Sequence, residues 1–456
     1  MMNTKEKMRV RNMTEGNPLS HILLFAIPLF IGNIFQQIYS IVDQMVAGHC
    51  LGDGAIAAIG ATSALYGLMI NLASGLNNGY AITVTQSFGA GDGQRLRRSI
   101  AGMIMLDAGS VVIITTLSLV FMEPLLRFMN TPENIFYEAY SYIAVICGGM
   151  GATICYNMVA GILRAVGNSR TPLYFLMLSS GINIGLDLLF VAVLGFGIIG
   201  TAVATVIAQT VSACAAGTYL LKNYRDILPE KEDFSHIPAS TYSALLSTGI
   251  SMGLMYCMID IGSVIFQRAN NELGEAIITA HTAARRWIMV FMQPLTTVAQ
   301  ANATFVGQNW GAGKKDRIRR AMRQVMGIEL LWCGFSAAVI FLLGGLLVSV
   351  TTGSNDIQMI DNAVLSLKLH VGFFPFVCII FVLRNAMQAM GKKVVPVSAS
   401  CIELAMKIGA ASVLIPMLGF LGTSLTEPLT WVVMMAFLSV AYLLMRKGLF
   451  GIDKTA

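Results

Sequence analysis

The chain has 456 residues, of which 55% are hydrophobic and only 12% are Asp, Glu, Lys or Arg. Soluble domains carry about 25% charged residues, so this composition excludes a soluble multidomain enzyme, a disordered chain and a disulfide scaffold. The formal net charge of +6 would suit nucleic-acid binding, but the basic residues lie between long apolar runs. There they are expected to face a membrane surface and its anionic lipid, and no nucleic-acid partner is expected.

The apolar runs predict an all-α, polytopic membrane protein with twelve transmembrane helices, because each run reaches the roughly 20 residues that a bilayer requires. Barrel strands are excluded, since the runs are too long and do not alternate. In chain order the predicted spans cover residues 20–46, 55–84, 99–121, 135–160, 172–193, 197–221, 241–267, 276–306, 323–350, 362–386, 396–417 and 422–445.

The lysines and arginines predict the orientation of these spans. With the N-terminus inside the cell, the inner segments hold 24 of the 30 basic residues, and the outer segments hold only Arg127 and Arg268. Basic residues concentrate on the cytoplasmic side of membrane proteins. We therefore expect both termini in the cytoplasm and the chain in the bacterial cytoplasmic membrane. The stretch before the first span is interpreted as a cytoplasmic arm rather than a signal peptide.

The sequence repeats itself at an offset of 222. VTQSFGAGDGQRLRR (84–98) aligns with VGQNWGAGKKDRIRR (306–320) with eight identities, and near an offset of 224 Ala165, Gly167 and Pro172 match Ala389, Gly391 and Pro396. The repeat predicts two pseudo-symmetric six-helix lobes, at 1–221 and 241–456, joined by a cytoplasmic linker at 222–240. Such repeats are typical of transporters that work by alternating access. One chain encloses the cavity, so a monomer suffices.

The first span carries a polar face with a carboxylate. Gln36, Tyr39 and Asp43 are spaced i, i+3, i+7, so they share one side of a helix. A carboxylate within a span costs about 2.5–3.5 kcal/mol to insert, which marks it as a candidate functional group. Pro28, earlier in the same span, removes a backbone hydrogen bond and favours a bend, which we interpret as a hinge.

The fifth span supplies a second carboxylate. Asp187 follows Asn183 by one turn on the same face, and Asn157 of the fourth span can add an amide. Facing carboxylates, amides and a phenol would form an oxygen-lined site. Such a site can hold Na⁺ at Asp43, Asn183 and Asp187, or it can bind H⁺ on its carboxyls. No other cofactor is expected.

These features resemble the multidrug and toxic compound extrusion (MATE) family. The paired GAG-x-x-x-R-[LI]-R-R loops, together with LRAVGNSRTP (163–172) and RNAMQAMGKKVVP (384–396), carry the resemblance over nearly the whole chain. It implies two six-helix lobes around a V-shaped cavity and export of organic, often cationic, compounds driven by inward H⁺ or Na⁺. In the DNA-damage-inducible branch of the family, a cation site lies in the N-terminal lobe. The matching positions here are Gln36, Tyr39, Asp43, Asn157, Asn183, Asp187 and Thr205, with Pro28 at the bend.

The chain departs from the other bacterial branch, which places an acidic pair on the seventh and tenth helices. The tenth span here has no Asp or Glu, and Asp260 of the seventh span is one position off that site. We therefore expect ion coupling in the N-terminal lobe. Asp260 is a candidate for binding substrate cations, and adaptable methionines are candidates for the cavity wall. These are Met69, Met255, Met289 and Met292.

Further charges lie within the C-terminal spans. Glu403 and Lys407 stand at i, i+4 and are predicted to pair. Arg285 and Arg286 can line the cavity or pair with Glu427, Asp260 or Glu329, and the sequence leaves that choice open.

The sequence thus favours a secondary antiporter, not an enzyme, that exports hydrophobic, cationic drugs in exchange for H⁺ or Na⁺. GAGDG and GAGKK lack the phosphate-loop pattern, and no nucleotide domain is visible to drive ATP-dependent transport. The first alternative is a lipid-linked-oligosaccharide flippase of the same superfamily, which would need a strongly basic cavity. The second alternative is a channel or a membrane-embedded binding protein.

Overall fold

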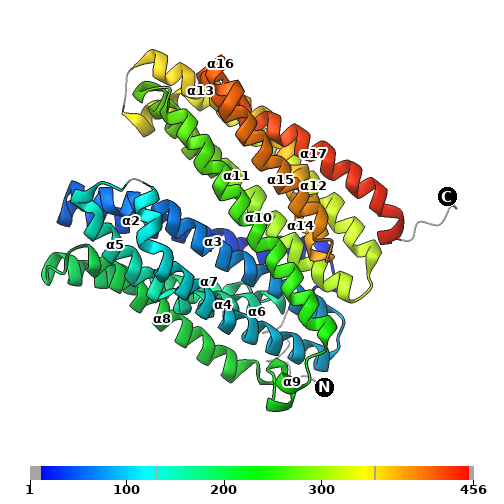
Figure 1. Cartoon of the computed structure of the whole chain (residues 1–456). Coiled ribbons are helices and arrows are strands. Elements are labelled where there is room, and N and C mark those ends of the chain that lie inside the picture. The colour runs from blue at the N-terminus through cyan, green and yellow to red at the C-terminus, as the bar shows by residue number, and fades with distance from the viewer. Residues whose placement is uncertain (1–11, 130, 354–355, 451–456) are drawn as a thin grey trace. The chain divides into compact units, whose positions relative to one another are not determined.

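The computed structural model describes residues 12–129, 131–353 and 356–450, and these form helices without a strand. Residues 1–11 and 451–456, on which the predicted orientation of the termini depends, lie outside the described part. The helices of the first half are α2 (Pro18–Leu51), α3 (Asp53–Gly89), α4 (Gly93–Phe128), α5 (Glu133–Gly148), α6 (Met150–Ala165), α7 (Arg170–Asp187), the π-helix η1 (Leu188–Val193) and α8 (Gly197–Asn223) (Figure 1).

The second half repeats this order after a short helical connection. The connection contains η2 (Arg225–Ile227) and α9 (Lys231–Ser235). The helices that follow are α10 (Ala239–Asn271), α11 (Glu275–Gly311), α12 (Lys315–Thr352), α13 (Ile357–Gly372), α14 (Phe374–Ala389), α15 (Val394–Gly409), the π-helix η3 (Ala410–Leu414), α16 (Ile415–Leu418) and α17 (Phe420–Phe450).

Most of these helices are suited to cross a membrane. Among the described residues, nine are long and apolar enough, and the bent pairs α5–α6 (42°) and α13–α14 (47°) bring the number to eleven. The remaining predicted span, residues 276–306, corresponds to α11, which has 37 residues but is less apolar because it carries His281, Arg285 and Arg286. Large apolar side chains such as Leu342 and Leu331 of α12 are more than three-quarters exposed. That exposure suits a lipid environment, and the chain is a multi-pass membrane protein.

The backbone repeats more closely than the sequence does. Every boundary of α5 and α6 recurs in α13 and α14 at an offset of 224, including the breaks at Gly149 and Phe373. Glycines with positive φ recur in pairs at offsets of 222 or 224, and these are Gly52 and Gly274, Gly91 and Gly313, Gly167 and Gly391, and Gly195 and Gly419. A left-handed φ excludes most side chains, so these glycines end their helices at matching places in both halves.

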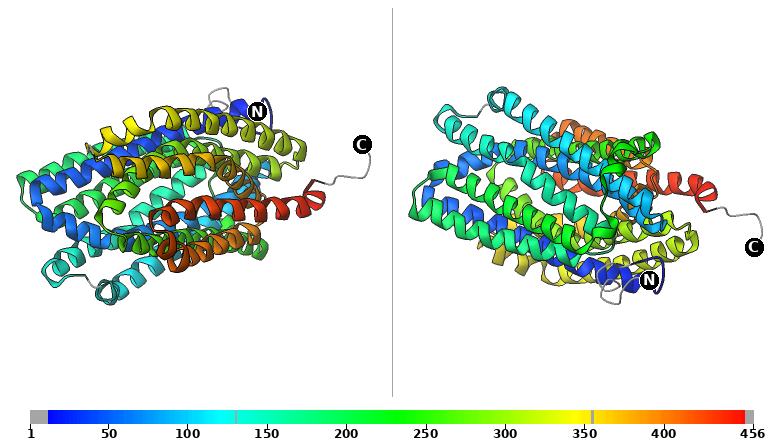
Figure 2. Two further views of the ribbon diagram at one scale, coloured as in Figure 1. Left: turned by 90° about the horizontal axis from the view of Figure 1, so that it is seen from above. Right: turned by 90° about the horizontal axis from the view of Figure 1, so that it is seen from below.

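The chain forms two compact units that divide within helices rather than at the predicted linker. One unit contains Leu24–Gly253, and the other contains Thr14–Leu23 with the described part of Leu254–Ala456. Helix α2 therefore begins with the second unit and continues in the first, whereas α10 begins with the first and continues in the second. Figure 2 shows the long helices of each unit running side by side.

Each unit has its own apolar core. In the first unit, Ile143, Ile146 and Met150 at the α5–α6 bend are packed between α3, α4 and α8. In the second, Phe374 at the matching α13–α14 bend is buried together with residues of α11 and α12. Residues beside both bends thus belong to the buried cores of their units.

Candidate cation-coupling site

Three helices of the first unit bring the predicted polar residues together. Tyr39 and Asp43 come from α2, Asn183 and Asp187 from α7, and Thr205 from α8. Helix α7 ends at Asp187, and the backbone continues as the π-helix η1. A π-turn inserts one extra residue per turn and is frequent at functional sites. Here the π-helix η1 begins at Leu188, directly after Asp187.

The polar side chains form a chain of hydrogen bonds that ends on Asp187. Tyr39 Oη lies 3.5 Å from Thr205 Oγ1. The Asn183 amide orientation that satisfies both its neighbours accepts from Thr205 Oγ1 at 3.1 Å and donates from Nδ2 to Asp187 Oδ2 at 2.8 Å. Each hydroxyl can then donate towards the next group. The alignment delivers a donor to the carboxylate and fixes its position.

The carboxyls of Asp43 and Asp187 lie close enough to interact. The two side chains are within hydrogen-bonding reach of each other, and Asp187 is fully buried. Asp43 Oδ1 and Asp187 Oδ1 accept no hydrogen bond from the described residues. Two neighbouring carboxylates repel each other, and sharing a proton relieves that repulsion. A cation between the oxygens would relieve it as well.

Two predicted members of the site are not joined to this network. Gln36 is exposed on α2, and Asn157 is half-buried on α6. Within the described part of the chain, neither side chain makes a hydrogen bond to the five residues above. Their roles as cation ligands stay predictions. Pro28 lies inside α2, ten residues into the helix, and its role as a hinge also stays a prediction.

The residues predicted to line a substrate cavity occupy different environments. Met69 accepts from Ser118 Oγ at 3.2 Å within the core of the first unit. In the second unit, Met255 is buried and accepts from Gln388 Nε2 at 3.0 Å, whereas Met289 is more than half exposed. Met292 packs beside the second core, and Asp260 is half-buried. Their contact with substrate remains a prediction.

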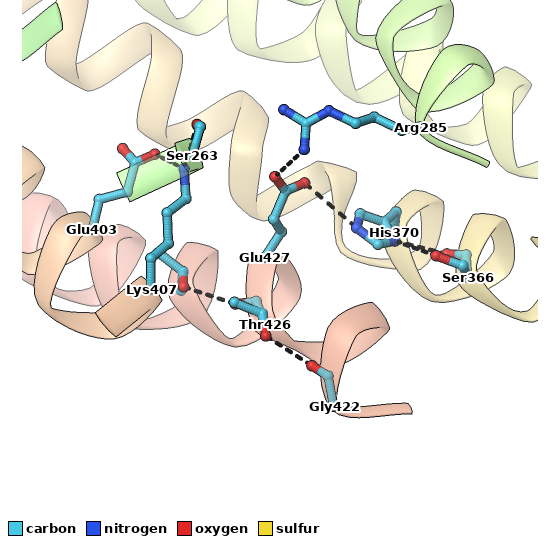
Figure 3. Close-up of polar contacts among 10 residues, drawn as sticks. Ser263, Arg285, Ser366, His370, Glu403, Lys407, Gly422, Thr426 and Glu427 are labelled. Carbon is cyan, nitrogen blue, oxygen red and sulfur yellow. Dashed lines mark hydrogen bonds and ion pairs between the residues drawn. The ribbon is translucent and has the colours of Figure 1, made fainter. Parts of the chain in front are cut away.

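A second polar cluster lies in the second unit and was only partly predicted (Figure 3). The expected pair forms, with Lys407 Nζ 3.0 Å from Glu403 Oε1. Arg285 Nη1 lies 3.6 Å from Glu427 Oε1, which settles the choice that the sequence left open. His370 Nε2 lies 3.5 Å from the other oxygen of Glu427. Sequence reasoning missed His370, because no spacing indicates that α13 turns this residue towards α17.

Comparison with known proteins now identifies the family. A sequence profile of the MatE family matches residues 28–189 and 246–411. The chain belongs to the MatE family. It is similar to the probable multidrug resistance protein YpnP of Bacillus subtilis, with 28% identity over 392 residues, 84% of this chain and 85% of YpnP. It is also similar to the multidrug export protein MepA of Staphylococcus aureus, with 21% identity over 386 residues and 83% of each chain.

A solved MATE structure has the same fold. The crystal structure of MATE in the bent conformation superposes with a TM-score of 0.88 over 98% of both chains, at 22% identity. The predicted architecture of twelve helices in two lobes is confirmed by this match. MATE proteins are transporters and not enzymes, so small molecules are the expected class of ligand.

Proposed function

We propose that this MATE protein is a secondary antiporter that exports hydrophobic, cationic organic compounds in exchange for H⁺ or Na⁺. The observation that carries the proposal is the close approach of the half-buried Asp43 to the fully buried Asp187. Carboxyls in contact must gain a proton or a cation, and their affinity for it depends on how closely α2 holds Asp43 against α7. Movement of α2 therefore couples ion binding to conformation. The names of YpnP and MepA support drugs as the substrates.

The surroundings of the pair support H⁺ as the ion. Asn183, positioned by Thr205, points one donor at Asp187 Oδ2 and leaves the face towards Asp43 to the second carboxyl. A shared proton satisfies two carboxyls with one hydrogen bond. Na⁺ instead needs several oxygen ligands, and Gln36 and Asn157 would have to turn towards the site to supply them.

The charge distribution disfavours the flippase alternative in the first unit. Residues 12–94 contain no Lys or Arg, and neither do residues 171–221. A pyrophosphate head group would meet two carboxylates there and no basic partner.

We further propose that the transporter works as a monomer, surrounded by lipid in the bacterial cytoplasmic membrane, with both termini in the cytoplasm.

The test is ethidium efflux from bacterial cells that lack their own pumps, with an H⁺ gradient or a Na⁺ gradient imposed separately. We expect one gradient to drive efflux by the wild type, and Asp43→Asn or Asp187→Asn to abolish it at equal amounts of membrane-inserted protein. Asp107→Asn is the matched control. Asp107 is a buried carboxylate of α4 in the same unit, outside the hydrogen-bonded site, so its replacement should preserve ion-driven efflux.

Retained ion-driven efflux in both Asp43→Asn and Asp187→Asn would refute coupling at this pair. Absence of efflux by the wild type under either gradient would favour the flippase. Ion flux without movement of the dye would favour the channel.

A further inference from the structure

A carboxylate of the second unit is held between an arginine and a histidine. Glu427 projects from α17, Arg285 from α11 and His370 from α13 (Figure 3). Arg285 approaches one carboxylate oxygen at 3.6 Å and His370 the other at 3.5 Å. The His370 ring is 1% exposed and meets the Trp431 ring edge-on, with centroids 5.6 Å apart. The imidazole is therefore fixed in one orientation.

The backbone of α13 sets the tautomer of His370. Its Nδ1 lies 2.7 Å from the carbonyl oxygen of Ser366, one turn earlier. A carbonyl oxygen only accepts, so Nδ1 must donate and must carry a hydrogen. In a neutral ring Nε2 would then hold a lone pair, directed at Glu427 Oε2. An acceptor facing an acceptor is repulsive in a buried site, and a proton between them converts the contact into a charge-assisted hydrogen bond.

Arg285 decides which of the two groups carries that proton. Its guanidinium does not lose its charge in proteins, and it lies against Glu427 Oε1. An ionised carboxylate is the form that such a neighbour favours. We infer that the Glu427–His370 pair is a proton-binding site in the C-terminal half of the chain, with the proton on His370 Nε2 and an imidazolium held between Ser366 and Glu427.

The other groups on α11 and α13 do not replace this proton. His281, one turn before Arg285, is buried with both ring nitrogens lacking a hydrogen-bond partner among the described residues, and it packs edge-on against Phe266. An imidazolium there would have no acceptor. Lys368 Nζ, two residues before His370, lies over the Phe341 ring of α12 at 5.5 Å, away from the pair.

The charges on the neighbouring helices α14 and α15 have an acceptor of their own. Lys407 Nζ binds Glu403 at 3.0 Å and Ser263 Oγ at 3.4 Å. Arg384 of α14 lies 3.9 Å from the other oxygen of Glu403. Lys407 still contributes a positive potential at Glu427. Glu403 is thus occupied by two basic groups, and Arg285 and His370 remain the direct partners of Glu427.

This inference goes beyond the proposed coupling at Asp43 and Asp187. It adds a separate proton site in the other half of the transporter, and neither site requires the other. The test is solid-state NMR of the full chain in lipid bilayers, with histidine labelled by ¹⁵N. Ring nitrogens that carry hydrogen are distinguished from those that do not by their chemical shifts, and the His370 signals are assigned by their loss in His370→Asn.

At pH 7.5 we expect both ring nitrogens of His370 to carry hydrogen in the wild type. In Glu427→Gln, only Nδ1 should carry it, because the carboxylate that holds the second proton is gone. His49 is the matched control, since its Nδ1 lies 2.9 Å from the carbonyl oxygen of Met45 on an exposed helix end. Its signals should not respond to Glu427→Gln.

An unprotonated Nε2 in the wild type would overturn the inference, and this outcome does not depend on any variant folding. A charged His370 that persists in Glu427→Gln would also overturn it, because the proton would then not belong to the pair. Asp43→Asn should leave the His370 signals unchanged. The efflux assay therefore tests the proposed coupling at Asp43 and Asp187 independently of the NMR experiment on His370.

Discussion

The approach of α3 to α10 within the first unit predicts a large effect from a single methyl group. A Cβ added at Gly75 would lie 2.7 Å from Gly253 Cα and 2.8 Å from the carbonyl oxygen of Met252. Ordinary contact begins near 3.4 Å, so one backbone must move by about 0.7 Å. Overpacking of this kind costs about 1–3 kcal/mol. Small residues allow such backbone contact between membrane helices, and Gly75→Ala should lower stability by about that amount.

The control lies on the same helix. Gly67 has no atom within 4 Å of an added Cβ, so Gly67→Ala should be neutral or stabilise the helix by up to about 1 kcal/mol. Thermal unfolding of the purified protein in detergent, followed by loss of the monodisperse chromatographic peak, compares the two variants with the wild type. If Gly75→Ala unfolds at the same temperature as Gly67→Ala or above it, the packing argument is wrong.

Two further predictions concern hydrogen bonds. Thr205→Val removes one of the two donors that the Asn183 amide oxygen accepts from, while the backbone N–H of Thr205 remains. Losing that hydrogen bond should cost about 0.5–1.5 kcal/mol and reduce ion-driven ethidium efflux, whereas Thr205→Ser should keep it. Equal activity of both variants would contradict the relay. Arg317 donates to the carbonyl oxygen of Gly16 at 2.8 Å, so Arg317→Ala should cost about 1.5–3 kcal/mol and expose the segment before α2 to protease. The exposed Arg320 is the control, and its replacement by Ala should change stability by less than about 0.5 kcal/mol.

Much of the helical architecture follows from the sequence, because the apolar runs and the repeat constrain it strongly. The bends at Gly149 and Phe373 and the π-helices after Asp187 and Gly409 do not follow from it. These features depend on how neighbouring helices fill the core, which hydropathy does not record. Helix α11 differs from expectation for a related reason. Arg285, which makes it less apolar, pairs with the half-buried Glu427, a contact between segments 142 residues apart.

The candidate site shows a similar limit. Helical spacing placed Tyr39 and Asp43 on one face, and Asn183 and Asp187 on another, and the structure brings the two faces together. The same spacing placed Gln36 beside them, but it is exposed. One face spans roughly a third of a helix. Helical spacing therefore identifies candidate site residues, but it does not determine which of them a neighbouring helix buries.

The two halves repeat a backbone but do not repeat its chemistry. At the offset of 224, Asn183 corresponds to Lys407, and each lies shortly before a π-helix. Asp187 corresponds to Ala411, while Glu427 corresponds to Val203. The same backbone position therefore holds an amide that serves a carboxyl pair in one half and an ammonium that needs a carboxylate in the other. Because neither acidic group is repeated, ion binding in each half must be changed separately, and a substitution in one half should leave the protonation of the other intact.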